Sequence, residues 1–279
     1  MAFDESTENH GAERADLLAQ TESLYDEARA QVIASRELPA STYRVQFNRT
    51  FGFRDAEALV AYWERLGISH LYASPYLKAV PGSTHGYDCV DHNQLNPEVG
   101  TEVEHHSMCQ ALTTRGLGQI LDVVPNHMGI ERENPLWWDV LENGPASLYA
   151  QYFDVDWNPV MEALRGKVLL PVLGDQYGRV LERGELKLHF EEGAFSVRYY
   201  DHAFPVAPRN YRKILRLNLE ELQKELGPED MRTVELLSVL TAIEHLPDRM
   251  ETERQRRVER NREKEVIKRR LATLCSSSP

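Results

Sequence analysis

The sequence predicts an α/β fold in which strands and helices alternate. Between residues 42 and 124, short apolar strand patterns are separated by segments with helical periodicity. Gly67 and Gly116 follow the two helical segments, and glycine commonly ends a helix. A strand–helix–strand–helix–strand order predicts parallel strands joined by right-handed crossovers. Such a unit can begin a (β/α)8 barrel or a doubly wound sheet, and the pattern alone leaves both open.

Residues 1–38 precede this unit as an acidic N-terminal extension. Five apolar residues recur there at near-helical spacing and favour a helix: Leu17, Leu18, Leu24, Ala28 and Val32. No chemistry can be assigned to the extension, so a peripheral helix and a disordered arm both remain open. Residues 1–10 are polar and lack an apolar segment, which argues against a secretory signal.

The first strand is expected at residues 42–47, where side chains of different polarity alternate. Residues 53–66 then show the spacing of a helix that ends at Gly67. A second strand is expected at residues 68–73, and Ser74-Pro75 stops it. These three segments form the first strand–helix–strand unit.

The second half of the unit contains a long connection. Residues 76–100 are rich in Gly, Pro, Asp and Asn and are expected to form a loop, and loops of that length are commonly functional. A helix is expected at residues 102–115. Residues 118–124 are mostly apolar and are typical of a buried parallel strand.

After Gly129 the alternation ends, and residues 131–208 are predicted to form a small α+β insertion subdomain. A hairpin is expected between residues 186–190 and 194–200, with residues 191–193 as its turn. The segment is also rich in aromatic residues, which either pack as the core of the subdomain or offer platforms to sugar rings. These are Trp137, Trp138, Tyr149, Tyr152, Phe153 and Trp157.

Residues 209–279 are predicted to be a helical segment. Apolar spacing indicates helices at residues 211–226, 231–243 and 251–274. The last of these mixes arginine and lysine with glutamate, and a solvated helix face is the favoured interpretation. The pairs Glu253/Arg257 and Glu265/Arg269 have the spacing of favourable helical ion pairs. A nucleic-acid surface is the alternative for this helix.

The composition excludes several classes of function. The net charge of −12 argues against nucleic acid as the main partner, because phosphates attract basic surfaces. No segment reaches the roughly 18 apolar residues of a membrane span. The 3 cysteines are scattered and suggest neither a metal site nor a disulfide framework, which is typical of a cytoplasmic protein. We expect no metal and no cofactor, and the composition leaves the oligomeric state open.

Two clusters of polar residues follow successive predicted strands. Asp122, Asn126 and His127 come at the end of the third strand, around Pro125. A carboxylate at the end of a buried strand is costly unless it is paired, so we expect Asp122 to orient a nearby arginine or a sugar-binding group. Active sites of barrel folds lie at the carboxyl ends of the strands. His127 could donate to a substrate hydroxyl, and Asn126 could hold the turn or a metal.

The second cluster lies in the loop after the second strand and contains His85, Tyr87 and Asp88. A tyrosine ring can stack on the apolar face of a pyranose, while histidine and carboxylate side chains bind vicinal hydroxyls. An ordinary loop with a glycine hinge at Gly86 is the alternative for this trio.

The segment Asp122–His127 resembles the first sequence signature of glycoside hydrolase family 13, the α-amylase family. Within that family the chain is similar to the maltooligosyl trehalose synthases. Six further segments carry this similarity: Thr42–Phe47, Leu71–Pro75, Gly82–Asp88, Leu95–Glu98, Asn134–Glu142 and Lys167–Gly174. The resemblance runs from about Pro39 to the helical C-terminal segment and leaves out the acidic extension.

The resemblance implies a (β/α)8 TIM barrel, of which residues 39–130 would be the first three strands with their helices. It implies an isomerase that turns the reducing-end α-1,4 link of a maltooligosaccharide into an α,α-1,1 link by retaining glycosyl transfer. His85, Tyr87, Asp122 and His127 would line the sugar subsite beside the scissile bond. Asp88 is a weaker candidate for the same α-1,4-glucan site, and Asn126 is a further substrate-binding candidate.

The catalytic carboxylates of this family follow the fourth, fifth and seventh barrel strands. Only three barrel strands are recognisable here, so we expect the nucleophile and the acid beyond Pro279 and this chain to be inactive alone. Two alternatives remain. One is another glucan hydrolase or transferase of the α-amylase family, and the other is a non-catalytic glucan-binding module.

Overall fold

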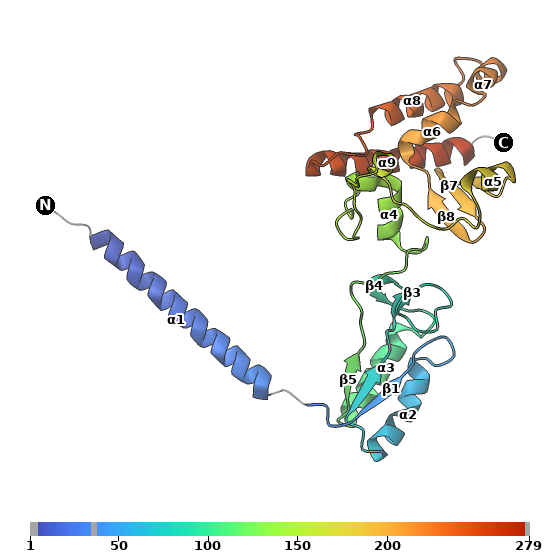
Figure 1. The fold of residues 1–279 in the computed structure, drawn as a ribbon. Helices are drawn as coiled ribbons and strands as arrows, with labels where there is room; N and C mark the ends of the chain where they lie inside the picture. Colours follow the sequence, from blue (N-terminus) through green and yellow to red (C-terminus); the bar gives the residue numbers. More distant parts are fainter. Residues whose placement is uncertain (1–4, 35–37, 277–279) are drawn as a thin grey trace.

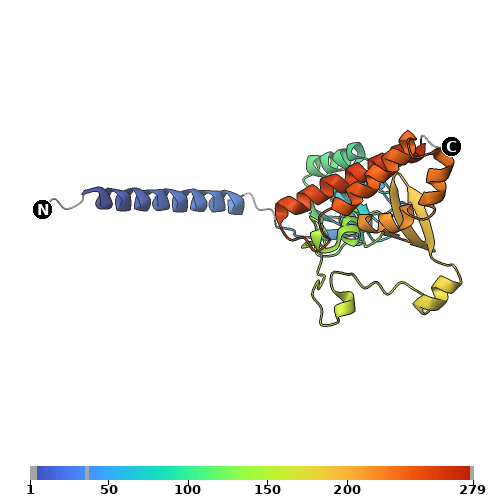
Figure 2. The ribbon, with the colours of Figure 1, turned by 90° about the horizontal axis from the view of Figure 1, so that it is seen from above.

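The computed structural model describes residues 5–34 and 38–276 and shows two lobes and one projecting helix (Figure 1). The first lobe comprises residues 38–130 and the second lobe residues 131–276. Helix α1 (Glu5–Ala34) stands apart from both lobes in two perpendicular views (Figure 2). Its apolar side chains are exposed, including Leu24 at 67% and Tyr25 at 68%. The helix expected in the extension is therefore present, and its apolar side chains between residues 17 and 33 are exposed to solvent.

The first lobe is built on a sheet of three parallel strands in the order β1-β2-β5. These are β1 (Thr42–Val45), β2 (His70–Ala73) and β5 (Gly118–Leu121). Residue pairs such as Arg44↔Tyr72 and Tyr72↔Ile120 set their register. The predicted α/β class and the parallel direction of all three strands are confirmed.

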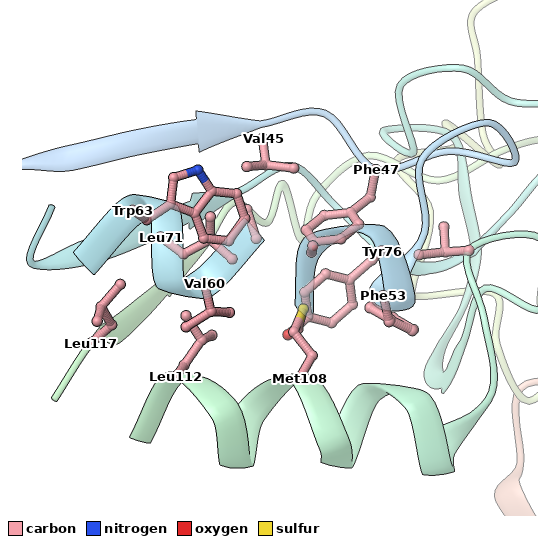
Figure 3. Packing of buried hydrophobic residues seen from close by; sticks show 13 residues of the cluster. Val45, Phe47, Phe53, Val60, Trp63, Leu71, Tyr76, Met108, Leu112 and Leu117 are labelled. Carbon is pink, nitrogen blue, oxygen red and sulfur yellow. The ribbon is translucent and has the colours of Figure 1, made fainter. Parts of the chain in front are cut away.

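Two helices cover one face of this sheet: α2 (Phe53–Arg65) and α3 (Glu102–Thr114). Buried side chains from the strands and both helices form one apolar core (Figure 3), which includes Val45, Phe53, Val60, Trp63, Leu71, Met108 and Leu112. Strand residues alternate between the two faces of a sheet. Because Val45 and Leu71 face the helices, Arg44 and Tyr72 face the opposite side.

The prediction of a plain loop at residues 76–100 is wrong. This segment contains the antiparallel strands β3 (Leu77–Ala79) and β4 (Cys89–Leu95), with register shifts at both steps. Gly82 and Gly86 have positive φ angles of 81° and 75°, which let the chain reverse between the strands. The polar residues of β4 hid its strand character in the sequence.

The third strand is parallel as expected but is only half-buried. β5 ends at Leu121 and, among the described residues, pairs with β2 alone, so it lies at the edge of the sheet. A strand covered on both faces and both edges would be buried. Val123, beyond the strand, is 42% exposed. The expectation of a fully buried strand is therefore wrong in this structure.

The second lobe begins with α4 (Pro135–Asn143), short 3-10 turns at Gly144–Ala146 and Glu162–Leu164, and α5 (Tyr177–Glu182). The predicted hairpin is confirmed as β6 (Lys187–Glu191) and β7 (Ala194–Tyr199), joined through Glu192 and Gly193. A third antiparallel strand, β8 (His202–Pro205), was not predicted and pairs with β7.

The helix expected at residues 211–226 is two helices, α6 (Pro208–Leu215) and α7 (Leu219–Leu226). Asn218 separates them with a left-handed φ of 59°, a conformation that interrupts a right-handed helix. α8 (Met231–His245) and α9 (Arg254–Ser276) follow as expected. Phe195 of β7 shares one core with Tyr211, Val239, Ile243, Ile267 and Leu271, so the three-stranded sheet and the helices pack as one lobe.

The solvated face predicted for α9 is wrong for part of that helix. Arg260 and Lys264 are buried, and Lys264 pairs with carboxylates of α4. Arg257 donates to the carbonyl oxygens of Ala146 and Ser147 instead of pairing with Glu253. α9 is therefore packed against α4 along one side. Among the described residues, no helix is long and apolar enough to cross a membrane.

Candidate functional site

The carboxyl ends of β1, β2 and β5 bring four polar side chains together. Arg44 of β1 and Tyr72 of β2 are register partners on the face opposite the helices. Asp122 follows β5, and its backbone N–H donates to the carbonyl oxygen of Ala73 at 2.9 Å, which continues the strand pairing by one residue. Tyr87 reaches the same place from the segment before β4. The cluster of Arg44, Tyr72, Tyr87 and Asp122 is named the carboxyl-edge cluster below.

Asp122 is the centre of this cluster. Its Oδ2 atom accepts hydrogen bonds from Tyr87 Oη at 2.5 Å, Arg44 Nη1 at 2.9 Å and Tyr72 Oη at 3.2 Å. Arg44 Nη2 also donates to Tyr87 Oη at 3.1 Å. The guanidinium of Arg44 lies 4.6 Å from the centre of the Tyr72 ring, within the range of a cation–π contact. All described side-chain donors to Asp122 go to Oδ2, which leaves Oδ1 as the oxygen available to a ligand hydroxyl.

The contacts of Asp122 fix its protonation. Hydrogen bonds from Tyr87 and then from Arg44 lower the pKa of the Asp122 carboxyl below its usual value. The reciprocal contact with Asp122 raises the pKa of the Tyr87 hydroxyl, so Tyr87 keeps its proton. At neutral pH the cluster therefore presents an ionised acceptor beside a protonated phenol and a permanent cation. Such a combination offers hydrogen-bond donors and an acceptor of fixed protonation.

Arg44 was not among the predicted site residues, although an arginine partner for Asp122 was expected. Two signals in the sequence pointed to it. Arg44 lies on a strand that ends at the same sheet edge as the strand before Asp122, and strand alternation places it on the face away from Val45. The pairing spans 78 residues of sequence, so only the sheet order β1-β2-β5 joins the two.

His85 and Asp88 lie beside Tyr87 at the edge of the cluster. The rings of His85 and Tyr87 stack at 5.9 Å with an angle of 26° between their planes. Asp88 accepts a hydrogen bond from Ser83 Oγ at 2.5 Å, and its carboxylate lies 3.8 Å from His85 Nδ1. The structure thus brings His85 next to the carboxyl-edge cluster and turns Asp88 toward the loop itself.

Asn126 and His127 lie farther along the chain after Asp122. Both are exposed, and the backbone N–H of His127 donates to the carbonyl oxygen of Val124 in a tight turn. Within the described part of the chain, no hydrogen bond joins their side chains to the cluster. Their assignment to the sugar site stays a prediction.

The surface around the cluster is shallow. The hollow lined by Tyr87, Asp122 and Val124 encloses only about 10 Å³, roughly the space of one water molecule. Across the described residues, no group of three His, Cys, Asp or Glu side chains is arranged to hold a metal ion.

Residues 57–178 match the family model described as the α-amylase catalytic domain. Over this segment the chain is similar to part of an α-amylase catalytic domain. The matched residues include Tyr72, Tyr87 and Asp122 of the carboxyl-edge cluster. Among curated proteins, the putative maltooligosyl trehalose synthase of Mycobacterium tuberculosis (strain H37Rv) is 42% identical over 175 residues, which are 60% of this chain and 21% of that protein.

The chain is also similar to an amylase. The intracellular maltogenic amylase of Bacillus subtilis (strain 168) is 34% identical over 101 residues, 36% of this chain and 16% of the amylase. The match to the curated maltooligosyl trehalose synthases covers about a fifth of their length.

Solved structures give the same result. The maltooligosyltrehalose synthase from Arthrobacter ramosus has a TM-score of 0.53 at 41% identity, covering 61% of this chain and 21% of that one. A hypothetical maltooligosyl trehalose synthase from Sulfolobus tokodaii has a TM-score of 0.53 at 35% identity, covering 67% and 24%. The predicted resemblance to maltooligosyl trehalose synthases is confirmed.

Proposed function

We propose that this chain supplies the sugar-binding part of a maltooligosyl trehalose synthase. The complete enzyme would convert the reducing-end α-1,4 link of a maltooligosaccharide to an α,α-1,1 link, as part of trehalose biosynthesis. The observation that carries the proposal is the carboxyl-edge cluster, in which Tyr87 and Arg44 hold Asp122 ionised. Tyr87 and Asp122 lie inside the segment that matches the α-amylase catalytic domain.

The proposed role of the cluster is to grip the glucose unit beside the bond that breaks. Asp122 Oδ1 would accept from one sugar hydroxyl, while the stacked rings of His85 and Tyr87 would lie against the apolar face of the pyranose. His127 would donate to a neighbouring hydroxyl once the turn after β5 closes on the sugar. The mixture of a fixed acceptor and an aromatic surface is what specific sugar pockets use.

The bond-making chemistry is assigned to carboxylates outside this chain. In retaining glycosyl transfer, one carboxylate attacks the anomeric carbon and a carboxylic acid about 5–5.5 Å away protonates the leaving oxygen. The released glucose would then attack the glycosyl intermediate through its anomeric hydroxyl, in place of the 4-hydroxyl through which it was linked before. The carboxyl-edge cluster contains one carboxylate, and it is committed to Arg44 and the two tyrosines, so we assign no catalytic residue to this chain.

The three parallel strands would be the first three of a (β/α)8 barrel, with residues 39–130 as its opening βα units. Residues 131–208 would be an insertion subdomain, residues 209–279 a helical segment and residues 1–38 an extension. The three cysteines are free thiols, which supports a cytoplasmic location for the enzyme. The proposed function needs no cofactor.

The test is product analysis with the protein expressed from its complete gene. Incubation with maltopentaose should remove reducing ends while the chain length stays unchanged, since isomerisation releases no sugar. Asp122→Ala in that protein should lower kcat/KM at least about 100-fold, since it leaves Arg44 and two tyrosines without their acceptor. New reducing ends would instead show an α-amylase-type hydrolase. Binding of maltopentaose without turnover would show a glucan-binding module.

A further inference from the structure

A second cavity lies in the second lobe, away from the carboxyl-edge cluster. It has a volume of about 640 Å³ and is bounded by α4, the β6–β7 turn and α9. Small-molecule sites commonly measure roughly 300–1,000 Å³. The residues that matter below are Trp138, Asp139, Glu142, Glu192, Lys264 and Lys268, all of which line it. The α4–α9 cavity is not used by the function proposed above.

Buried ion pairs form one wall of the α4–α9 cavity. Lys264 Nζ lies 2.6 Å from Asp139 Oδ1 and 2.9 Å from Glu142 Oε2, and Lys268 Nζ lies 2.7 Å from Glu142 Oε1. The side chains of Glu142 and Lys264 are only 2% and 4% exposed. Each charge therefore has its counter-charge within hydrogen-bond distance, and the wall presents fixed donors and acceptors with little net charge.

This charge balance selects the kind of ligand. A phosphate or carboxylate ligand would have to compete with Asp139 and Glu142 for the two lysines, and the five carboxylates that line the cavity outnumber its four cations, which include Arg132 and Arg269. A metal cation would have to displace both ammonium groups from the same carboxylates. Neither charged class fits, whereas hydroxyl groups can accept from ammonium groups and donate to carboxylates that are already paired.

Trp138 adds an apolar surface to the same cavity. Its ring is half-buried on α4, and the guanidinium of Arg132 lies 5.7 Å from the ring centre. The neighbouring Trp137 is buried and packs against Phe153 at 4.9 Å. Of these two adjacent tryptophans, Trp137 therefore belongs to the core, and Trp138 is the one that lines the cavity.

We infer that the α4–α9 cavity is a second binding site, for a neutral oligosaccharide of two or three sugar units. The aromatic surface takes the apolar face of a pyranose, and the paired charges take its hydroxyls. The inference stands on the cavity alone and does not depend on the reaction proposed for the complete enzyme.

The test is titration of this 279-residue chain with maltotriose, cellotriose and isomaltotriose by calorimetry. At least one should bind, and binding should persist in Asp122→Asn, which alters only the carboxyl-edge cluster. Trp138→Ala should weaken it at least about 10-fold. Ala272→Trp on α9 should also weaken sugar binding at least about 10-fold, because it places a large ring into the cavity. Trp157→Ala is the matched control, a half-buried tryptophan outside the cavity, and should bind like the wild type.

A readout on the unaltered chain makes the result independent of how the variants fold. The indole N–H signal of Trp138 in an NMR spectrum should shift on addition of the bound trisaccharide, while inorganic phosphate should neither shift it nor compete. The inference is overturned if none of the three sugars binds, if Asp122→Asn abolishes all binding, or if phosphate displaces the sugar. Failure of the product assay above would leave this binding intact, so the two proposals fail separately.

Discussion

Asp122 is held by several hydrogen-bond donors of the carboxyl-edge cluster. Three donors converge on a single carboxylate oxygen and lower the pKa of the Asp122 carboxyl. The hydrogen bond to Asp122 in turn raises the pKa of the Tyr87 hydroxyl. In the folded chain the contacts of Asp122 favour its charged form, so their stabilising effect is present above the ordinary aspartate pKa. The effect is lost as the pH falls through the lowered value.

Tyr87→Phe should raise the pKa of Asp122 toward the ordinary value of about 3.9, because the largest cause of its lowering is the Tyr87 hydrogen bond. Titration of the side-chain carboxyl by carbon-detected NMR measures this directly. Tyr43→Phe is the control, since the Tyr43 ring packs against Trp63 on the other face of the sheet. An unchanged Asp122 midpoint in Tyr87→Phe would show that the Tyr87 contact does not form in solution.

Sequence reasoning reached part of this site. It placed Tyr87 and Asp122 in one site and expected an arginine beside Asp122, because a carboxylate at the end of a strand needs a partner. It missed Arg44 itself and Tyr72. Their role depends on which strands are neighbours in the sheet, and neither periodicity nor composition reports the order β1-β2-β5.

At the scale of single elements, the sequence predicted the helix boundaries that are set by interactions between residues close together in the chain. Thr101 is the N-cap residue of α3, and its hydroxyl accepts a hydrogen bond from the Glu104 N–H. The Glu104 carboxylate accepts one from the Thr101 N–H in return. The break at Asn218 and the strands β3 and β4 were missed, because tertiary packing overrides a weak local preference there.

Asn134 at the start of α4 gives a prediction at this scale. Its Oδ1 accepts from the N–H groups of Leu136 and Trp137, and its Nδ2 donates to the carbonyl oxygen of Gly129 at 2.8 Å. Asn134→Ala should lower the free energy of unfolding by about 2–3 kcal/mol, from the lost cap and the unpaired carbonyl. Urea denaturation measures it. The control Asn158→Ala, at an exposed position, should stay within about 0.5 kcal/mol of the wild type.

The turn between β6 and β7 gives a second prediction about stability. Gly193 has a φ of +79°, and a Cβ atom there would collide with the backbone carbonyl of Lys268 in α9. Gly193→Ala should cost about 2–4 kcal/mol, because it adds backbone strain to a close contact between backbones. The matched control is Gly178→Ala in α5, where a Cβ atom meets nothing within 4 Å. A drop in thermal midpoint as small as that of Gly178→Ala would contradict the packing of the turn on α9.

At the scale of the whole molecule, the two lobes are each stabilised by their own buried residues. The two lobes have separate apolar cores, one around Phe53 and Met108 and one around Tyr211 and Ile267. The sequence predicted a change of architecture after Gly129 from the end of strand–helix alternation. It did not predict that β7 shares its core with α6, α8 and α9, since those contacts join segments far apart in the chain.

Helix α1 gives the prediction at this scale. It stands apart from the lobes (Figure 1). Its apolar side chains between residues 17 and 33 are exposed. Removal of residues 1–38 should therefore shift the thermal midpoint of the remaining chain by no more than about 1–2 °C, because the side chains described there, at residues 17–33 and 38, are all exposed. Calorimetry of both forms checks this. A fall of about 4 °C or more would mean that the helix packs on a lobe in solution.

The pairing of Glu142 with Lys264 has a consequence for synthesis. The two residues are 122 positions apart, so the carboxylate leaves the ribosome long before its ammonium partner. At about 5–20 residues per second, the interval is roughly 6–25 s. During that time α4 carries a charge that cannot be buried without its counter-charge. The second lobe must therefore complete its packing only after α9 has emerged, while the first lobe, whose core ends at Leu117, can fold well before.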